Sequence, residues 1–138
     1  MMDRRQFLKN TCFACLAIGA GVSLPACKPM QVIKASNNKG VFEIDEKELL
    51  PGNDVFLVRA SPLEYDILLV RKNDTYTALY LQCTHNQNAV MATKTNIICN
   101  SHGAEFGFDG KVKKGPATEP LRKFPVSSAN GKIAIRIS

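Results

Sequence analysis

Two short motifs of cysteine and histidine constrain this chain of 138 residues more than any other feature of its sequence. In the first motif one residue separates Cys83 from His85, and in the second two residues separate Cys99 from His102. The chain has two histidines, so each of them lies close to a cysteine. Both side chains are good metal donors, and a short loop can present two of them in one direction. The motifs therefore predict a metal centre that is shared by two loops.

Other interpretations of these four residues stay open at this point. A disulfide between Cys83 and Cys99 would be ordinary for an exported protein, but it leaves the histidines unexplained. Structural zinc sites usually group cysteine with cysteine and histidine with histidine, whereas each motif here is mixed. A cysteine nucleophile with a histidine base needs one motif and leaves the other unused. A binuclear iron–sulfur cluster accounts for all four side chains.

The chain from residue 41 onward shows the pattern of short β-strands. Residues 41–44 and 75–82 alternate between apolar and polar side chains, and 54–59 and 66–71 are short apolar runs. Asn73-Asp74, Asp109-Gly110 and Asn130-Gly131 are strong signals for hairpin turns. The acidic stretch DEKELL at residues 45–50 has room for one helical turn. These features predict a small all-β domain of about eight to ten strands, with the motifs in loops between hairpins.

With these motifs and their spacing, the chain resembles the Rieske 2Fe–2S protein family. The pattern is C-x-H, thirteen residues, then C-x-x-H-G, followed by HGAEFGFDGKVKKGPATEPL at residues 102–121. The resemblance implies a small antiparallel β-sandwich over residues 41–138, with two loops at one tip that hold one 2Fe–2S cluster. It also implies that Cys83 and Cys99 bind the inner iron and that His85 and His102 bind the outer iron. A loop containing residues 115–117 would cover the cluster.

This implied ligand set determines the charge of the cluster. Two ferric ions, two sulfides and two thiolates sum to zero in the oxidised form and to minus one in the reduced form. Adding an electron to a neutral site costs less than adding one to a four-thiolate cluster, so histidine ligation raises the reduction potential. The family range is about −150 to +300 mV. The outer histidines would serve as the exit for the electron and can couple reduction to protonation.

The chain departs from the respiratory members of this family at five positions. Those members carry two further cysteines that form a disulfide between the loops, and here Asn88 and Ser101 hold these positions. They also have a serine and a tyrosine that donate hydrogen bonds to sulfur, where this chain has Ala104 and Phe106. Asn86 replaces an apolar residue at the tip. The loops therefore resemble those of ferredoxin-type Rieske proteins, and fewer hydrogen-bond donors predict a lower reduction potential.

The first 27 residues have the order of an export signal or membrane anchor. Residues 4–9 (RRQFLK) resemble the twin-arginine signal family, whose pathway moves folded proteins. Residues 24–27 (LPAC) resemble a lipobox with Cys27 as the lipidated residue, although Pro25 departs from the usual small residues. The rival is an uncleaved anchor, because the 18 residues from Asn10 to Cys27 carry no charge.

Both outcomes predict an extracytoplasmic domain held at a membrane. Residues 28–40 have a polar, turn-prone composition and are expected to form a flexible tether that reaches roughly 40 to 45 Å.

Composition narrows the possible functions. The net charge is +6, but the positive residues are scattered, and no aromatic-studded basic stripe indicates nucleic-acid binding. No substrate pocket or catalytic residue is evident. We therefore expect an electron carrier or an oxidoreductase subunit rather than an enzyme that acts on its own. We expect one-electron transfer between redox partner proteins. The alternatives are a Rieske subunit of a quinol-oxidising or other oxidoreductase complex and, from another class, a zinc-stabilised binding module.

Overall fold

The computed structural model describes residues 29–137, which form thirteen strands and one 3-10 turn, η1 (Glu46–Glu48). The strands are β1 (Gln31–Lys34), β2 (Ser36–Asn38), β3 (Val41–Asp45), β4 (Val55–Arg59), β5 (Ile67–Lys72), β6 (Thr75–Tyr80), β7 (Met91–Ala92), β8 (Ile97–Ile98), β9 (Glu105–Phe106), β10 (Val112–Lys114), β11 (Lys123–Phe124), β12 (Val126–Ala129) and β13 (Lys132–Arg136). No α-helix occurs in this part of the chain, so the predicted all-β class is confirmed.

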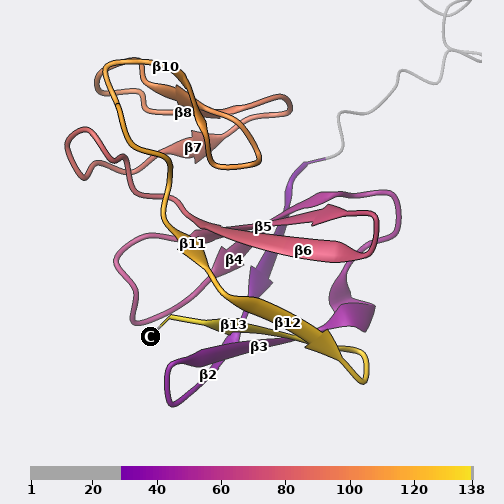
Figure 1. Ribbon diagram of the computed structural model, residues 1–138. Helices are drawn as coiled ribbons and strands as arrows, with labels where there is room; N and C mark the ends of the chain where they lie inside the picture. The colour runs from indigo at the N-terminus through magenta and orange to yellow at the C-terminus, as the bar shows by residue number, and fades with distance from the viewer. Residues whose placement is uncertain (1–28, 138) are drawn as a thin grey trace, which may run out of the picture.

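The strands form three sheets that stack as three layers (Figure 1). The bottom sheet has the order β12-β13-β3-β2, the middle sheet β1-β4-β5-β6-β11 and the top sheet β10-β9-β8-β7. Because the middle sheet is covered on both faces, strand β5 is apolar without alternation, and Ile67, Leu68 and Leu69 are all fully buried. The predicted sandwich therefore corresponds to the lower two layers, and the third layer carries the loops.

Two hydrophobic cores separate the three layers. The lower core lies between the bottom and middle sheets and includes Phe42, Phe56 and Ile133. The upper core lies between the middle and top sheets and includes Leu68, Phe106 and both motif cysteines. Neighbouring residues of β5 thus belong to different cores, since successive side chains of a strand point to opposite faces.

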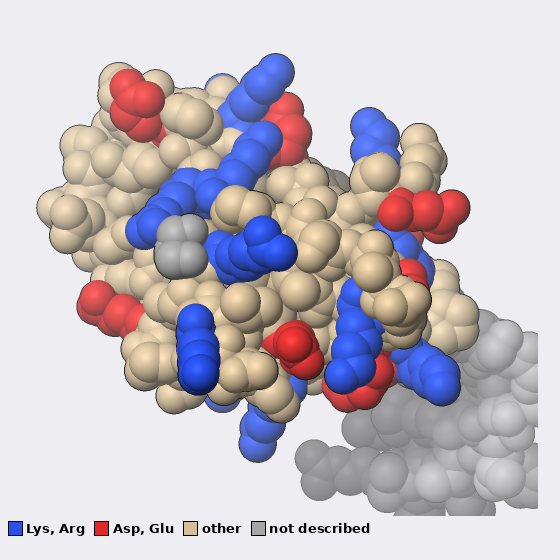
Figure 2. Space-filling view, turned by 60° about the horizontal axis from the view of Figure 1, so that its bottom comes forward, with Lys and Arg blue, Asp and Glu red and all other residues tan. Residues whose placement is uncertain are grey.

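The outer face of the bottom sheet is polar. Lys and Arg side chains are spread over the face in Figure 2, with Asp and Glu between several of them. One example is the ion pair between Lys132 Nζ and Glu43 Oε2 at 3.6 Å, which joins the neighbouring strands β13 and β3. Exposed pairs of this kind stabilise a fold by less than about 1 kcal/mol, so the buried inner face of the sheet is what holds it in place.

The number of strands was underestimated because several have only two residues. Strands β7, β8 and β9 are too short for alternation to be recognised in the sequence. The predicted hairpin turns are present between β5 and β6, β9 and β10, and β12 and β13. The predicted helical turn corresponds to η1.

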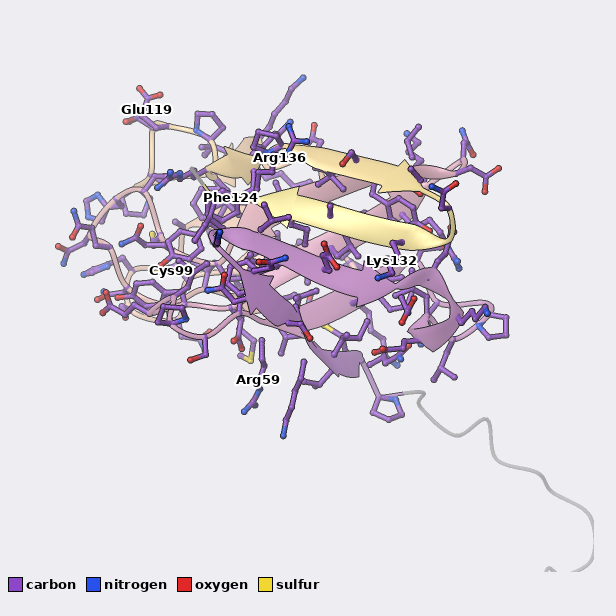
Figure 3. All side chains as sticks on the ribbon, turned by 90° about the horizontal axis from the view of Figure 1, so that it is seen from below. Arg59, Cys99, Glu119, Phe124, Lys132 and Arg136 are labelled. Carbon is purple, nitrogen blue, oxygen red and sulfur yellow. The ribbon has the colours of Figure 1, made fainter. Side chains whose placement is uncertain are left out.

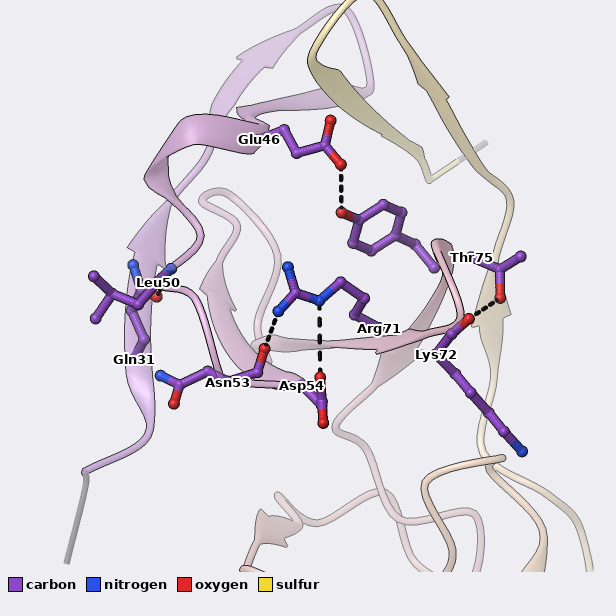
Figure 4. A network of polar contacts seen from close by, with 9 residues as sticks. Gln31, Glu46, Leu50, Asn53, Asp54, Arg71, Lys72 and Thr75 are labelled. Atoms are coloured by element: carbon purple, nitrogen blue, oxygen red, sulfur yellow. Dashed lines mark hydrogen bonds and ion pairs between the residues drawn. The ribbon is translucent and has the colours of Figure 1, made fainter.

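The expectation of a flexible tether at residues 28–40 is wrong over most of its length. Strand β1 pairs in parallel with β4, strand β2 pairs with β3, and Ile33 is buried in the lower core. The Gln31 side chain lies beside Leu50 (Figure 4) and accepts a hydrogen bond from its backbone N–H at 2.9 Å. It also donates a hydrogen bond to the Glu48 carbonyl. The two strands lie at sheet edges, where polar side chains are common, so their composition resembles that of a linker.

The predictions for residues 1–27, including the signal, the anchor and lipidation of Cys27, lie outside the described residues. Between residues 29 and 137, no helix is long and apolar enough to cross a membrane.

Candidate metal centre

The first motif lies in a tight loop between β6 and β7, which we call the first loop (residues 83–89). The Cys83 backbone N–H donates to the Asn88 carbonyl at 2.7 Å, and the Gln87 N–H donates to the Cys83 carbonyl at 2.8 Å. Both bonds return to the cysteine, so the backbone curls around it. The residues between, including His85, are exposed at the turn of the loop.

The second loop (residues 99–104) joins β8 to β9 and repeats this hydrogen-bond pattern. The Cys99 N–H donates to the Ala104 carbonyl at 2.8 Å, and the Gly103 N–H donates to the Cys99 carbonyl at 2.8 Å. In both loops the cysteine therefore bonds to the residues four and five positions later. Cys99 lies among the loops at one end of the domain, at the left in Figure 3.

The residue four positions after each cysteine has a left-handed backbone, with φ of 53° at Gln87 and 74° at Gly103. Glycine adopts this conformation without strain, whereas another L-residue pays about 1 to 2 kcal/mol for it. The two loops thus reach the same geometry, but only the second has the residue that suits it.

The four motif side chains form two pairs, one inside and one outside. The Cys83 and Cys99 thiols are free and fully buried in the upper core. The rings of His85 and His102 are exposed, with centroids 5.1 Å apart and planes at 81°. The structure therefore brings together all four predicted residues and contains no disulfide between the two cysteines.

The electrostatics of Cys83 are dominated by burial. Burial raises the pKa of the Cys83 thiol, the backbone N–H groups of His85 and Asn86 lower it, and a hydrogen bond to the Cys99 side chain raises it. The backbone N–H groups are donors that favour a thiolate. A metal that replaces the thiol protons would relieve the cost of burial, because thiolates bind metal directly.

This donor set fits a binuclear cluster. A single structural zinc ion needs its four ligands around one point, whereas the four side chains here are divided into a buried pair and an exposed pair. Two paired thiols below two paired imidazoles instead suit two metal ions, one held by each pair. The arrangement therefore matches a 2Fe–2S cluster with mixed ligands.

Two hydrogen bonds brace the first loop from outside, and neither was predicted. Thr84 Oγ1 donates to the Glu119 carbonyl at 2.7 Å, which ties the first loop to the segment that follows Ala117. Tyr65 Oη donates to the Gln87 carbonyl at 2.7 Å from the loop before β5. Thr84 could have been suspected from its place inside the first motif. Tyr65 carries no signal in the sequence, because it lies 22 residues from its partner.

Ala104 and Phe106, which replace the serine and tyrosine donors of the respiratory relatives, lie in the upper core. Ala104 and Phe106 are both fully buried there, together with the two cysteines. Ala117, within the segment expected to cover the cluster, is buried in the same core. The surroundings of the cysteines are therefore apolar on the side away from the loops.

Comparison with known proteins agrees with this geometry. Residues 40–125 match the family described as the Rieske 2Fe-2S domain. The cytochrome b6-f complex iron-sulfur subunit of Chlorobaculum tepidum is 26% identical over 141 residues, which cover 99% of this chain and 76% of that protein. The crystal structure of a plasma membrane Rieske protein of the cyanobacterium Synechocystis PCC 6803 is 28% identical, with a TM-score of 0.52 over 60% of this chain and 86% of that one.

A naphthalene 1,2-dioxygenase structure shares the fold at 20% identity, with a TM-score of 0.57 over 77% of this chain and 27% of that chain. None of these comparisons supports a zinc-stabilised module. The family match spans more than half of the sequence and contains both loops. The chain therefore belongs to the Rieske 2Fe–2S domain family and binds a single 2Fe–2S cluster.

Proposed function

We propose that this protein transfers single electrons between partner proteins, with Cys83 and Cys99 binding the inner iron and His85 and His102 the outer iron. The observation that carries the proposal is the division into a buried thiol pair and an exposed imidazole pair. When bound, the cluster supplies a carrier that takes up and releases one electron at a time.

The protein's own residues divide the remaining tasks. The buried cysteines hold the inner side away from water, in the apolar upper core. The exposed histidine rings present the outer side to a docking partner, and the second nitrogen of each ring can hold or release a proton. We assign no substrate pocket and no catalytic residue. Electrons enter and leave at the edges of the two histidine rings, because these edges are exposed to a docking partner.

The ligand assignment is tested by Cys83→Ser and His102→Ala, compared with Asn100→Ala as a control. Asn100 is exposed in the same loop and has no role in the proposed ligand set. Each ligand variant should lose the assembled cluster, because it removes one of four protein ligands, while the control should keep it. The measurements are iron and sulfide content and the electron paramagnetic resonance (EPR) spectrum of the reduced protein. A ligand variant with full iron and sulfide content and an unchanged spectrum would refute the assignment.

We also propose that the protein is exported through the twin-arginine pathway and held at a membrane on the extracytoplasmic side. The support is the sequence at residues 1–27, with its arginine pair and uncharged stretch. Replacing Arg4 and Arg5 by lysine should stop export of the folded protein. Cys27→Ser should abolish lipid modification if Cys27 is the anchor. If both the wild-type protein and the Cys27→Ser variant remain at full length, with masses that differ only by the substitution itself, an uncleaved anchor is favoured instead.

A second candidate function is that of a Rieske subunit in a quinol-oxidising complex. It is favoured by the similarity over 99% of the chain to a protein named as the iron-sulfur subunit of a cytochrome b6-f complex. The substitutions at the tip and in the loops, among them Asn86 and Asn88, argue for an independent carrier instead. Purification from membranes after mild cross-linking discriminates: a stoichiometric membrane cytochrome supports the subunit, and weakly bound redox proteins support the carrier.

A further inference from the structure

Large hydrophobic side chains are exposed at one side of the domain. Among the described residues these are Val32, Leu50 and Met91, with exposed fractions of 50%, 55% and 54%. They come from β1, from the turn after η1 and from β7, yet all lie around the point where the described chain begins. The Leu50 backbone N–H bonds to the Gln31 side chain, and Met91 lines a groove together with Met30. We call the surface formed by Met30, Val32, Leu50 and Met91 the entry face.

The entry face contains an apolar groove of about 340 Å³ between strand β7 and the edge of the middle sheet. Leu57, Leu81 and Val90 line it together with the two methionines. A wider hollow of about 770 Å³ adjoins it and shares the Met30 side chain. The register of β1 and β4 sets Val32 opposite Leu57, so the apolar surface continues from the groove onto the sheet edge.

Charged side chains border this apolar surface. Two pairs further along the same register, Lys34 lies opposite Arg59, and both side chains are exposed. Figure 3 shows Arg59 projecting from the side of the domain where the described chain begins, away from Glu119 and Arg136. Glu64 and Asp66 also line the groove, and the β4–β5 register, which sets Val58 opposite Ile67, places Asp66 at the same end as Arg59. Charges of both signs therefore border this end of the groove.

The chain between this face and the uncharged N-terminal stretch is short. The uncharged stretch ends at Cys27, and β1 begins at Gln31, which leaves three residues between them. Even when fully extended, the four steps from Cys27 to Gln31 span only about 14 Å. The tether expected from the sequence would have been about three times as long.

We propose that the entry face rests on the surface of a lipid bilayer. This inference rests on the proposed membrane attachment and adds its geometry. If Cys27 is held at the membrane, the short connection keeps Gln31 near it, and the apolar groove then faces the lipid. Exposed apolar side chains supply the area that is buried at a lipid interface, and the exposed Lys34 and Arg59 side chains can contact the headgroups. Because Ala89 and Val90 also line the groove, the first loop lies beside the membrane surface rather than far above it.

The test uses the absence of tryptophan from the sequence. A single substitution, Val32→Trp or Met91→Trp, gives the full-length, cluster-loaded protein one fluorescent reporter on the entry face. The control is Ser128→Trp, an exposed position on β12 in the bottom sheet. Each variant is reconstituted into vesicles of phosphatidylethanolamine and phosphatidylglycerol with brominated acyl chains, which quench tryptophan at the lipid boundary.

The two entry-face reporters should shift to shorter wavelength and lose emission intensity in these vesicles, and the control should do neither. Met91→Trp is the stronger reporter, because residue 91 is far from the anchor in sequence. If the protein sediments with vesicles but the entry-face reporters are unquenched, the orientation is refuted while membrane attachment stands. If the protein does not sediment with vesicles at all, membrane attachment fails and the orientation with it. Leu50→Trp replaces Val32→Trp if that variant loses the visible spectrum of the cluster.

Discussion

The two cluster-binding loops reach the same geometry by different means. Both fold their backbone around a cysteine with the same two hydrogen bonds. The second loop joins two paired strands and places Gly103 at the left-handed position. The first loop places Gln87 there and is held instead by side chains from outside, Thr84 and Tyr65. One loop is therefore stable through its own backbone, and the other depends on its neighbours.

The largest effect is expected from removing both external bonds of the first loop. The double variant Thr84→Val with Tyr65→Phe deletes two hydroxyl donors and keeps the side-chain shapes. Each hydrogen bond contributes about 0.5 to 1.5 kcal/mol, so the loop should open more often and release iron faster. The measurement is the rate of cluster loss, followed by visible absorption in the presence of a chelator.

A matched control is Tyr76→Phe, which removes the hydroxyl that donates to Glu46 Oε1 at 2.7 Å. This bond has the same length as that of Tyr65 but joins β6 to η1, and neither element belongs to the two loops. Cluster loss at the wild-type rate in the double variant, or equally fast loss in the control, would contradict the bracing role.

The next largest effect is expected on the stability of the two loops, when glycine and glutamine are exchanged at the left-handed positions 103 and 87. Gly103→Gln should destabilise the second loop by about 1 to 2 kcal/mol, because a side chain at φ of 74° is strained. No atom lies within 4 Å of a Cβ added there, so the cost comes from the backbone rather than from a clash. Gln87→Gly should have the opposite sign, with a gain of at most about 1 kcal/mol after the entropy cost of glycine.

Thermal unfolding of the cluster-loaded protein measures both substitutions. A stabilising Gly103→Gln, or a destabilising Gln87→Gly, would show that the left-handed position does not distinguish the loops.

Part of the fold and of the candidate site could be predicted from the sequence. The rest could not, and the reasons are physical. The spacing of Cys83, His85, Cys99 and His102 predicted a metal centre shared by two loops, and the resemblance to the Rieske family implied which iron each residue binds. Strand β1 was missed because it is a four-residue edge strand with a single buried residue, Ile33, which is too short for a periodic pattern to be recognised. The Tyr65 bond joins segments that are close only in the folded chain, so no local pattern indicates it.

The smallest effect concerns the reduction potential. We expect the wild-type potential in the lower part of the Rieske range, roughly −150 to +50 mV near neutral pH, because Ala104 and Phe106 donate no hydrogen bonds to sulfur. Ala104→Ser with Phe106→Tyr should raise the potential, since such bonds stabilise the more negative reduced state. For a one-electron couple, about 59 mV is a tenfold change in equilibrium, so even one weak bond is measurable by redox titration. A wild-type potential near +300 mV that the substitutions leave unchanged would contradict this account.

The central claim is that two thiols and two imidazoles hold one 2Fe–2S cluster. The chain has two histidines, so labelling histidine with nitrogen-15 marks only the two proposed imidazole ligands. Pulsed EPR of the reduced, labelled protein is the most direct measurement. The account predicts strong couplings from two directly bound nitrogens that change with the label. A spectrum without such couplings, or with couplings that the label leaves unchanged, would contradict it.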